Sequence, residues 1–221
     1  MDGNWKDDKI NGLFKIYYEN GQIEEEANLK DGKKNGLVKT YFKSGTLSIE
    51  GNYKDDKKNG TEILYHKNGQ IEQECNYVDD NFEGAIKTYY ENGQLEFEAN
   101  YVNGKVEGLF QIWYENGQLE KEGNYVNGKL EGLYRWWYEN GQLEREGDFI
   151  SDKYNGLWRY WYKNGQLKEE SNYVKGKTEG LHRQWFENGQ LRQEGLFVDG
   201  KAKGLWRFWS ENGVRKGNGY F

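Results

Sequence analysis

The sequence has no proline, one cysteine and two histidines in 221 residues. Because Cys75 is the lone cysteine, the fold cannot depend on an intramolecular disulfide. The chain has 37 acidic and 31 basic residues and no basic block to neutralise phosphates, which disfavours nucleic acid as a partner. No apolar run approaches a membrane span or a signal-peptide core. As given, the chain is expected to be soluble, redox-indifferent and cytoplasmic. An upstream signal on a longer protein would instead place it at the cell surface or outside.

Aromatic residues supply most of the apolar surface, with nine Trp, 18 Tyr and 10 Phe. Aromatic side chains are favoured in strands. The 30 glycines, together with the absence of proline, fit a sheet whose backbone donors are all used and whose turns are made by glycine. Composition alone therefore predicts β-structure.

Two series of glycines repeat along the chain with a step of 24 residues. The first series is Gly12, Gly36, Gly60, Gly84, Gly108, Gly132, Gly156, Gly180 and Gly204. The second is Gly21, Gly45, Gly69, Gly93, Gly117, Gly141, Gly165, Gly189 and Gly213. Asn precedes each glycine of the second series except Gly45, which follows Ser44. Such a period indicates a repeat protein.

Each repeat reads as a β-hairpin. Asn140-Gly141 separates two alternating segments, which predicts a two-residue type I′ turn with φ > 0 at both central residues. A second short turn, such as Asn127-Gly128, joins one repeat to the next. Consecutive strands must then pair antiparallel, giving about eighteen strands. We expect an all-β fold, an elongated, twisted, single-layer antiparallel meander of nine 24-residue β-hairpin repeats.

The array is expected to be a single domain over residues 1–221. A partial repeat covers 1–11, full repeats start at 12, 36, 60, 84, 108, 132, 156 and 180, and a last partial repeat covers 204–221. No atypical capping repeat is present at either end. The chain is therefore expected to be a fragment of a longer protein, or to have its ends covered by partners or by end-to-end self-association.

The turns predict which side chains face one another. A two-residue first turn places Arg135 opposite Glu146, and the same register sets Lys or Arg against Glu in five other hairpins. A two-residue second turn places Gly123 opposite Gly132, in a row of small residues. The small-residue row is Ala27, Gly51, Cys75, Ala99, Gly123, Gly147, Ser171, Gly195 and Gly219.

These registers define two faces of the sheet. Face one carries Leu133, Arg135, Trp137, Glu144 and Glu146. Face two is the more apolar face, and its members in the same repeat are Tyr134, Trp136, Tyr138, Leu143, Gly147 and Phe149. The aromatic rings of face two are expected to lean over the small-residue row, where a Cβ would clash.

Aromatic residues become larger and more numerous from Gly132 onward, which suggests a binding surface. The alternative is that the rings only replace the missing core of a single-layer sheet. We predict that face two of the C-terminal half binds a protein or peptide. The candidate residues are Tyr134, Trp136, Tyr138, Trp158, Tyr160, Tyr162, Trp206 and Phe208.

The repeat core G-L-x-x-x-[WY]-[YF]-x-N-G-Q-[LI] resembles the variant MORN repeat, and in particular the YwqK-type antitoxin family of bacteria. The matching residues of one repeat are Gly132, Leu133, Trp137, Tyr138, Asn140, Gly141, Gln142, Leu143, Glu146, Gly147 and Phe149. The sequence departs from the pattern at Thr61 and Ala85, which replace the leucine, and at His66 and Ser210, which replace the second aromatic. The resemblance implies stacked hairpins used as interaction modules; MORN proteins are linked to scaffolding, dimerisation and membrane lipids.

No constellation in the sequence indicates catalysis or a cofactor. His66 and His182 occupy different repeat positions, and each replaces a face-two residue. Cys75 lies in the small-residue row and is expected to be a packed thiol. Glutamate pairs such as Glu144 and Glu146 recur in most repeats, whereas a catalytic pair would be singular and pocketed. We expect no enzyme activity, no metal and no cofactor.

The prediction is a non-enzymatic protein–protein interaction scaffold, of antitoxin type if the resemblance extends to function. Two alternatives stay open, a cell-surface carbohydrate or ligand binder with aromatic platforms and a lipid-associated MORN module. A membrane lipid is disfavoured by the net charge of −6 and the lack of a basic patch.

Overall fold

The structure, a computed structural model, describes residues 4–6 and 9–221; residues 1–3 and 7–8 of the predicted partial repeat lie outside the described part. The chain divides into two compact units, Met1–Glu107 (unit 1) and Gly108–Phe221 (unit 2). The described residues of both units form strands and turns without a helix, and so include no apolar helix of membrane-spanning length.

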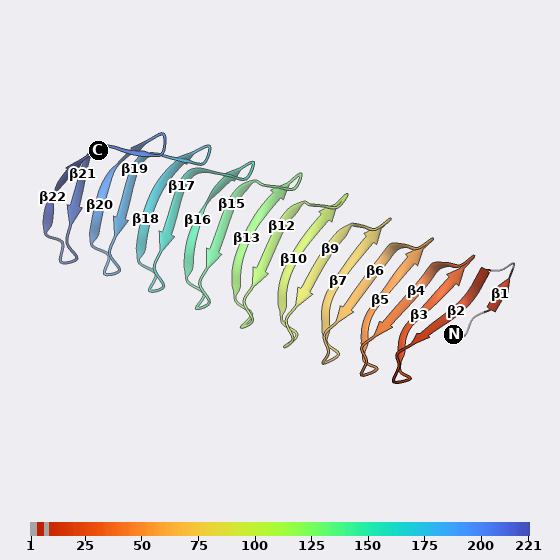
Figure 1. The fold of residues 1–221 in the computed structure, drawn as a ribbon. Helices are drawn as coiled ribbons and strands as arrows, with labels where there is room; N and C mark the ends of the chain where they lie inside the picture. The colour runs from red at the N-terminus through yellow and green to blue at the C-terminus, as the bar shows by residue number, and fades with distance from the viewer. Residues whose placement is uncertain (1–3, 7–8) are drawn as a thin grey trace. The chain divides into compact units, whose positions relative to one another are not determined.

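Unit 1 is a layer of hairpins in which each long strand pairs antiparallel with its neighbours in sequence (Figure 1). Its strands are β1 (Asn4–Lys6), β2 (Lys9–Tyr17), β3 (Ile23–Lys30), β4 (Lys33–Tyr41), β5 (Leu47–Lys54), β6 (Lys57–Tyr65), β7 (Ile71–Val78), β8 (Asn81–Phe82), β9 (Gly84–Tyr89), β10 (Leu95–Val102) and β11 (Lys105–Val106).

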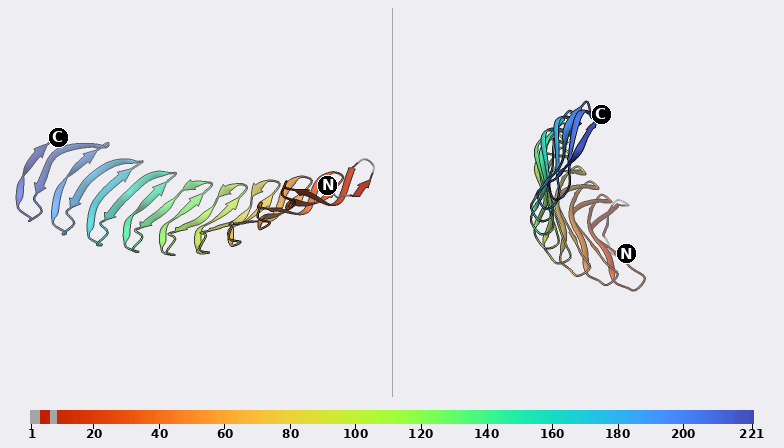
Figure 2. Two further views of the ribbon diagram at one scale, coloured as in Figure 1. Left: turned by 60° about the horizontal axis from the view of Figure 1, so that its bottom comes forward. Right: turned by 90° about the vertical axis from the view of Figure 1, so that its left-hand side faces the viewer.

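Unit 2 repeats the same arrangement, with the turns after the first strand of each hairpin along one margin and the connecting turns along the other (Figure 2). Its strands are β12 (Gly108–Trp113), β13 (Leu119–Val126), β14 (Lys129–Leu130), β15 (Gly132–Trp137), β16 (Leu143–Ile150), β17 (Lys153–Trp161), β18 (Leu167–Val174), β19 (Lys177–Trp185), β20 (Leu191–Val198), β21 (Lys201–Trp209) and β22 (Arg215–Tyr220). Within each unit the predicted single-layer antiparallel meander is confirmed.

More strands are present than the expected number because some first strands of a repeat are interrupted. Between β8 and β9 the interruption is Glu83, and between β14 and β15 it is Glu131. The N–H groups of Glu83 and Glu131 donate to the carbonyls of Asn76 and Asn124 across the strand pair, both at 2.9 Å. The backbone hydrogen bonding between the two strands therefore continues through a bend at this point.

The first turn differs from the prediction. Asn140 has a negative φ, and Gly141 alone is left-handed, with φ of 81°. The Gly141 N–H donates to the Tyr138 carbonyl at 2.8 Å, and the Tyr138 N–H donates to the Gln142 carbonyl at 2.8 Å. The loop is therefore a three-residue turn ending in a left-handed glycine, not a two-residue type I′ turn.

The predicted charge ladder is nevertheless confirmed, because a bulge restores the register. Trp137 pairs with Leu143, Glu144 is the extra residue, and Arg135 then pairs with Glu146. Leu143 consequently lies on face one with Trp137, and its predicted place on face two was wrong. All six predicted ion pairs form across their hairpins, Lys15–Glu26, Lys39–Glu50, Lys87–Glu98, Arg135–Glu146, Arg159–Glu170 and Arg183–Glu194.

The asparagine of the first turn has a role that the prediction missed. The Asn140 side-chain oxygen accepts a hydrogen bond from the Gln142 N–H at 3.1 Å, and its Nδ2 donates to the Lys163 carbonyl in the next repeat's turn at 3.0 Å. The same two bonds recur at Asn164, where Nδ2 reaches the Glu187 carbonyl at 2.9 Å. Asparagine is therefore selected because its amide joins successive turns, not because it tolerates positive φ.

The second turn is the one that adopts the type I′ form. Both central residues are left-handed, as at Ser151 and Asp152, with φ of 49° and 66°. The predicted register beyond this turn was wrong, because Glu122 pairs with Arg135 whereas Tyr125 pairs with Leu130. Gly132, with φ of 78°, lies in the bulge that produces this shift. Gly123 therefore lies against the ring of Tyr134 and not opposite Gly132.

The shifted register builds the buried centre of the sheet. We call the core row of unit 2 the line of buried face-two residues that crosses the strands, Phe110, Gly123, Tyr134, Gly147, Trp158, Ser171, His182, Gly195 and Trp206. A Cβ added at Gly147 or Gly195 would overlap the indole of Trp158 or Trp206. The prediction that rings cover the small-residue row is confirmed in unit 2 at Gly123, Gly147 and Gly195, but in unit 1 Gly51 lies against Glu62 and Ala27 pairs with Val38.

The turn hydrogen bonds generate a prediction at the single position where the asparagine is missing. Ser44 bonds Thr46 within its own turn and is too short to reach the next one. Ser44→Asn should add the bond between turns and raise the free energy of unfolding by about 1 kcal/mol, and Asn164→Ser should lower it by a similar amount. Urea denaturation of the two variants checks both signs. Equal stabilities would contradict the assigned role of the amide.

Candidate functional site

Face two of unit 2 carries a second row of residues beside the core row. We call the surface row the line of half-buried residues Ile112, Lys121, Trp136, Arg145, Tyr160, Glu169, Gln184, Gln193 and Phe208. Their pairings run without interruption across the strands, as in Lys121 with Trp136, Trp136 with Arg145, and Arg145 with Tyr160. This row presents side chains of several chemical types at the surface, and it is the candidate docking surface.

The eight predicted binding residues fall into three groups. Tyr134, Trp158 and Trp206 belong to the core row, with exposed fractions of 6%, 0% and 5%. Burial raises the pKa of the Tyr134 hydroxyl above its usual value of 10.0. These three side chains form the core of the sheet, and a partner cannot reach them without displacing their neighbours.

Tyr138 and Tyr162 lie at the margin formed by the first turns. The Tyr138 hydroxyl donates to the Trp161 carbonyl at 2.8 Å, and the Tyr162 hydroxyl donates to the Trp185 carbonyl at 2.8 Å. Both bonds join one repeat to the next. These tyrosines are half-buried, so part of each ring stays accessible while its hydroxyl is used internally.

Trp136, Tyr160 and Phe208 lie in the surface row and are half-buried. The Trp136 ring contacts the core, with centroids 3.9 Å from Tyr134 and 6.0 Å from Trp158. The Trp136 ring is therefore held in place by these two buried rings. Partly exposed aromatic side chains that are held in place are typical anchors for a partner.

Sequence reasoning missed Arg145 and Lys121, which lie between the aromatic residues of the surface row. The guanidinium of Arg145 lies over the Trp136 ring, 3.9 Å from its centroid. The alternation that put Glu144 and Glu146 on face one already placed Arg145 on face two. Arg145 is not aromatic, so the gradient of aromatic residues that indicated the site did not include it.

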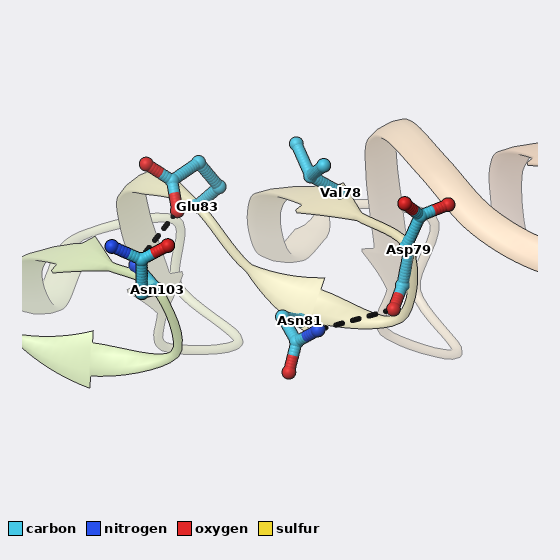
Figure 3. Close-up of a pocket in the computed structure, with 5 residues that line it drawn as sticks. All are labelled: Val78, Asp79, Asn81, Glu83 and Asn103. Atoms are coloured by element: carbon cyan, nitrogen blue, oxygen red, sulfur yellow. Dashed lines mark hydrogen bonds between the residues drawn. The ribbon is translucent and has the colours of Figure 1, made fainter.

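Several hollows lie along the margins, where successive turns leave space between them. The hollow drawn in Figure 3 has a volume of about 480 Å³ and is lined by Val78, Asp79, Asn81, Glu83 and Asn103. The Glu83 carboxylate accepts a hydrogen bond from the Asn103 N–H at 2.8 Å, and the Asn81 amide donates to the Asp79 carbonyl at 3.1 Å. The same carboxylate-to-turn bond recurs from Ser151 to Glu131 and from Asp199 to Glu179. These hollows are thus a repeated consequence of how turns are joined.

Comparison with known families agrees with this repeating geometry. The MORN repeat variant pattern matches residues 10–31, 34–55, 58–79, 82–103, 106–127, 130–150, 154–175 and 178–199. The chain belongs to the MORN repeat variant family. The eight matches correspond to the eight full repeats predicted from the glycine series. The chain matches no curated protein.

Each matched segment begins two residues before a bulge glycine, and all but 130–150, which stops one residue earlier, end at the first central residue of a type I′ turn. The matched segments are therefore hairpins whose ends lie at the second margin. In unit 1, Glu62 occupies the position that Trp158 holds in unit 2; it is 3% exposed, and Lys58 Nζ lies 2.8 Å from its carboxylate. Cys75 pairs with Glu62 and is buried, which raises the pKa of its thiol and confirms the expected packed thiol.

His182 belongs to a polar cluster that the sequence did not indicate. Its Nδ1 lies 2.7 Å from the Ser171 Oγ, which donates to Glu169 at 3.0 Å. Since the hydroxyl has one proton, the Nδ1–H donates to the hydroxyl oxygen. Ser171 is 1% exposed and His182 is 6% exposed, so the hydroxyl has no surface from which to attack a substrate. Together they fill the space that a glycine and an indole occupy in neighbouring repeats.

No group of three or more His, Cys, Asp or Glu in residues 4–6 and 9–221 is arranged to hold a metal ion.

The buried histidine gives a pH-dependent prediction. Burial lowers the pKa of His182 below 6.5, and the nearby Glu169 opposes this only in part. In the unfolded chain His182 therefore takes up a proton near pH 6.5, whereas in the folded chain its imidazole stays neutral. The stability that neutral His182 contributes is consequently lost as the pH falls below that value. The free energy of unfolding of the wild type should decrease over this window more steeply than that of His182→Gln. Parallel pH profiles would contradict the burial of a neutral imidazole.

Proposed function

We propose that this chain is a non-catalytic scaffold that binds a protein or peptide along the surface row of unit 2. The observation that supports the proposal is a line of half-buried aromatic side chains, Trp136, Tyr160 and Phe208, with Arg145 among them. Trp, Tyr and Arg dominate the energetics of protein interfaces. The rings are held from below by the core row, so binding orders few side chains.

The predicted gradient of aromatic residues has two causes in this proposal. Indoles at Trp158 and Trp206 follow from the glycines beneath them and need no partner. The half-buried rings of the surface row have no such requirement, because the corresponding position in unit 1 holds Thr40 or Leu64. The enrichment at this row therefore favours contact with a partner.

An antitoxin role is the finer form of the proposal, since the sequence resembles the YwqK-type family. The partner would then be a toxin protein. A toxin gene beside the gene for this chain, and recovery of that toxin on the chain, are the observations that favour it.

The experiment compares two double variants of the full chain as baits in an extract of the native host. Trp136→Ala with Tyr160→Ala removes aromatic surface from the surface row, and Tyr17→Ala with Tyr41→Ala removes rings of unit 1. A partner identified by mass spectrometry should be recovered in similar amounts on the wild type and on the unit 1 variant. Its recovery on the surface-row variant should fall at least about tenfold. Circular dichroism checks that both variants are folded. Equal retention by the two folded variants would remove the site.

A further inference from the structure

Arg145 is a cation of the surface row that forms no ion pair with a carboxylate in the described part of the chain. Its guanidinium lies 3.9 Å from the Trp136 ring centroid, and its Nε is buried and has no hydrogen-bond partner among the described residues. On face one, by contrast, Arg135, Arg159 and Arg183 are paired with glutamates at 3.1 to 3.4 Å. A guanidinium has five N–H donors in a planar fork, so Arg145 keeps donors for a ligand.

The charges around Arg145 favour an anion. In unit 2, the surface row itself carries three charges, Lys121, Arg145 and Glu169. Beside the row, toward the margin of the first turns, lie the charged bulge residues Glu120, Glu144, Lys168 and Arg192, so β12 to β20 carry four basic and three acidic residues on face two. The Glu169 carboxylate accepts hydrogen bonds from Ser171 at 3.0 Å and from Gln184 at 2.9 Å. Lys121 lies 3.5 Å from Glu120, and both side chains are about 30% exposed, so solvent screens this pair.

The two units also differ in the balance of charge. Residues 108–221 contain 17 Lys and Arg against 16 Asp and Glu, whereas residues 1–107 contain 14 against 21. All seven arginines lie in unit 2. Unit 1 is therefore net acidic and repels an acidic partner, whereas unit 2 is nearly neutral and Arg145 supplies a directed contact.

The spacing of the surface row selects a conformation for that partner. Each step along the row crosses one strand, about 4.8 Å, so Lys121 and Arg145 are separated by about 10 Å, as are Trp136 and Tyr160. A polyproline-II chain has three residues per turn and rises about 9.3 Å per turn. A partner in this conformation therefore presents equivalent side chains at nearly the spacing of alternate members of the row.

We propose that the surface row from Lys121 to Tyr160 binds an acidic peptide segment in the polyproline-II conformation, with a carboxylate at every third residue. This inference rests on the proposed function of the same surface and adds the class of partner. One carboxylate accepts hydrogen bonds from the terminal NH₂ groups of Arg145, and the next carboxylate along lies at Lys121. The apolar residues between them pack on Trp136 and Tyr160, as proline-rich segments do in grooves lined by aromatic rings.

The test measures binding of two synthetic peptides to the full chain by fluorescence anisotropy. One peptide consists of repeated Pro-Pro-Glu triplets and the other of repeated Pro-Pro-Gln triplets of the same length, so the two differ in charge alone. The acidic peptide should bind at least about tenfold more tightly than the neutral one, and added salt should weaken the acidic peptide selectively.

Variants then locate the contact. Arg145→Gln should weaken binding of the acidic peptide about tenfold, to the level of the neutral peptide, and Arg145→Lys should recover part of it. Arg192→Gln is the matched control, because Arg192 is an exposed arginine that lies over the Phe186 ring at 5.7 Å outside the surface row. Arg159→Gln controls for loss of charge on face one. Neither control should change the affinity for the acidic peptide by more than about twofold.

Three results would overturn the inference. Equal binding of the two peptides, lost together in Trp136→Ala but kept in Arg145→Gln, would leave a peptide surface that does not select charge, so the proposed function would survive alone. Binding of neither peptide would reject the acidic polyproline-II partner, and the host-extract experiment would decide the proposed function separately. Binding of heparin or of phosphatidylserine vesicles in an Arg145-dependent manner, without binding of the acidic peptide, would assign the site to another class of anion.

Discussion

The rings of Tyr134, Trp158 and Trp206 lie over glycines of the preceding strand, and this contact supplies what a single-layer sheet otherwise lacks. A sheet buries its apolar face against another layer in most folds. Here each ring is instead covered by the backbone and rings of adjacent strands. The contact requires a small residue beneath each large one. Two other pairs fill the equivalent space with no ring or with a smaller one, Ala27 with Val38 and Ser171 with His182.

This requirement fixes the other features of the repeat. The ring reaches the small residue only because a left-handed glycine such as Gly132 produces the bulge that shifts the register beyond the second turn. The asparagine bonds between turns then hold neighbouring repeats at the spacing that the contact needs. Face one, with its ion-pair ladder, is left to solvent. The side chains next to the core row, which are half-buried and held from one side, become the surface available to a partner.

The period of the glycines was sufficient to predict the hairpins, the two faces and the charge ladder, because alternation along a strand tolerates errors of two residues in register. It was not sufficient for the turns. Asn-Gly at 140–141 has the composition of a type I′ turn, yet that conformation occurs at the connecting turns, as at Ser151-Asp152. The cluster of Ser171, His182 and Glu169, and the position of Gly123 beneath Tyr134, depend on the bulge. Local composition does not reveal such a bulge. The same bulge decides which predicted site residues are buried. Trp158 lies in the core row and Trp136 is half-buried beside it, a difference that the sequence does not reveal.

A double-mutant cycle between Gly147 and Trp158 tests the central claim most directly. Gly147→Ala should destabilise the wild type by about 1–3 kcal/mol, because the new Cβ overlaps the indole. In a Trp158→Val background, which recreates the Ala27 and Val38 pair, the same substitution should be neutral or stabilising. The account therefore predicts a coupling free energy of at least about 1 kcal/mol in urea denaturation. Additive effects of the two substitutions would contradict it.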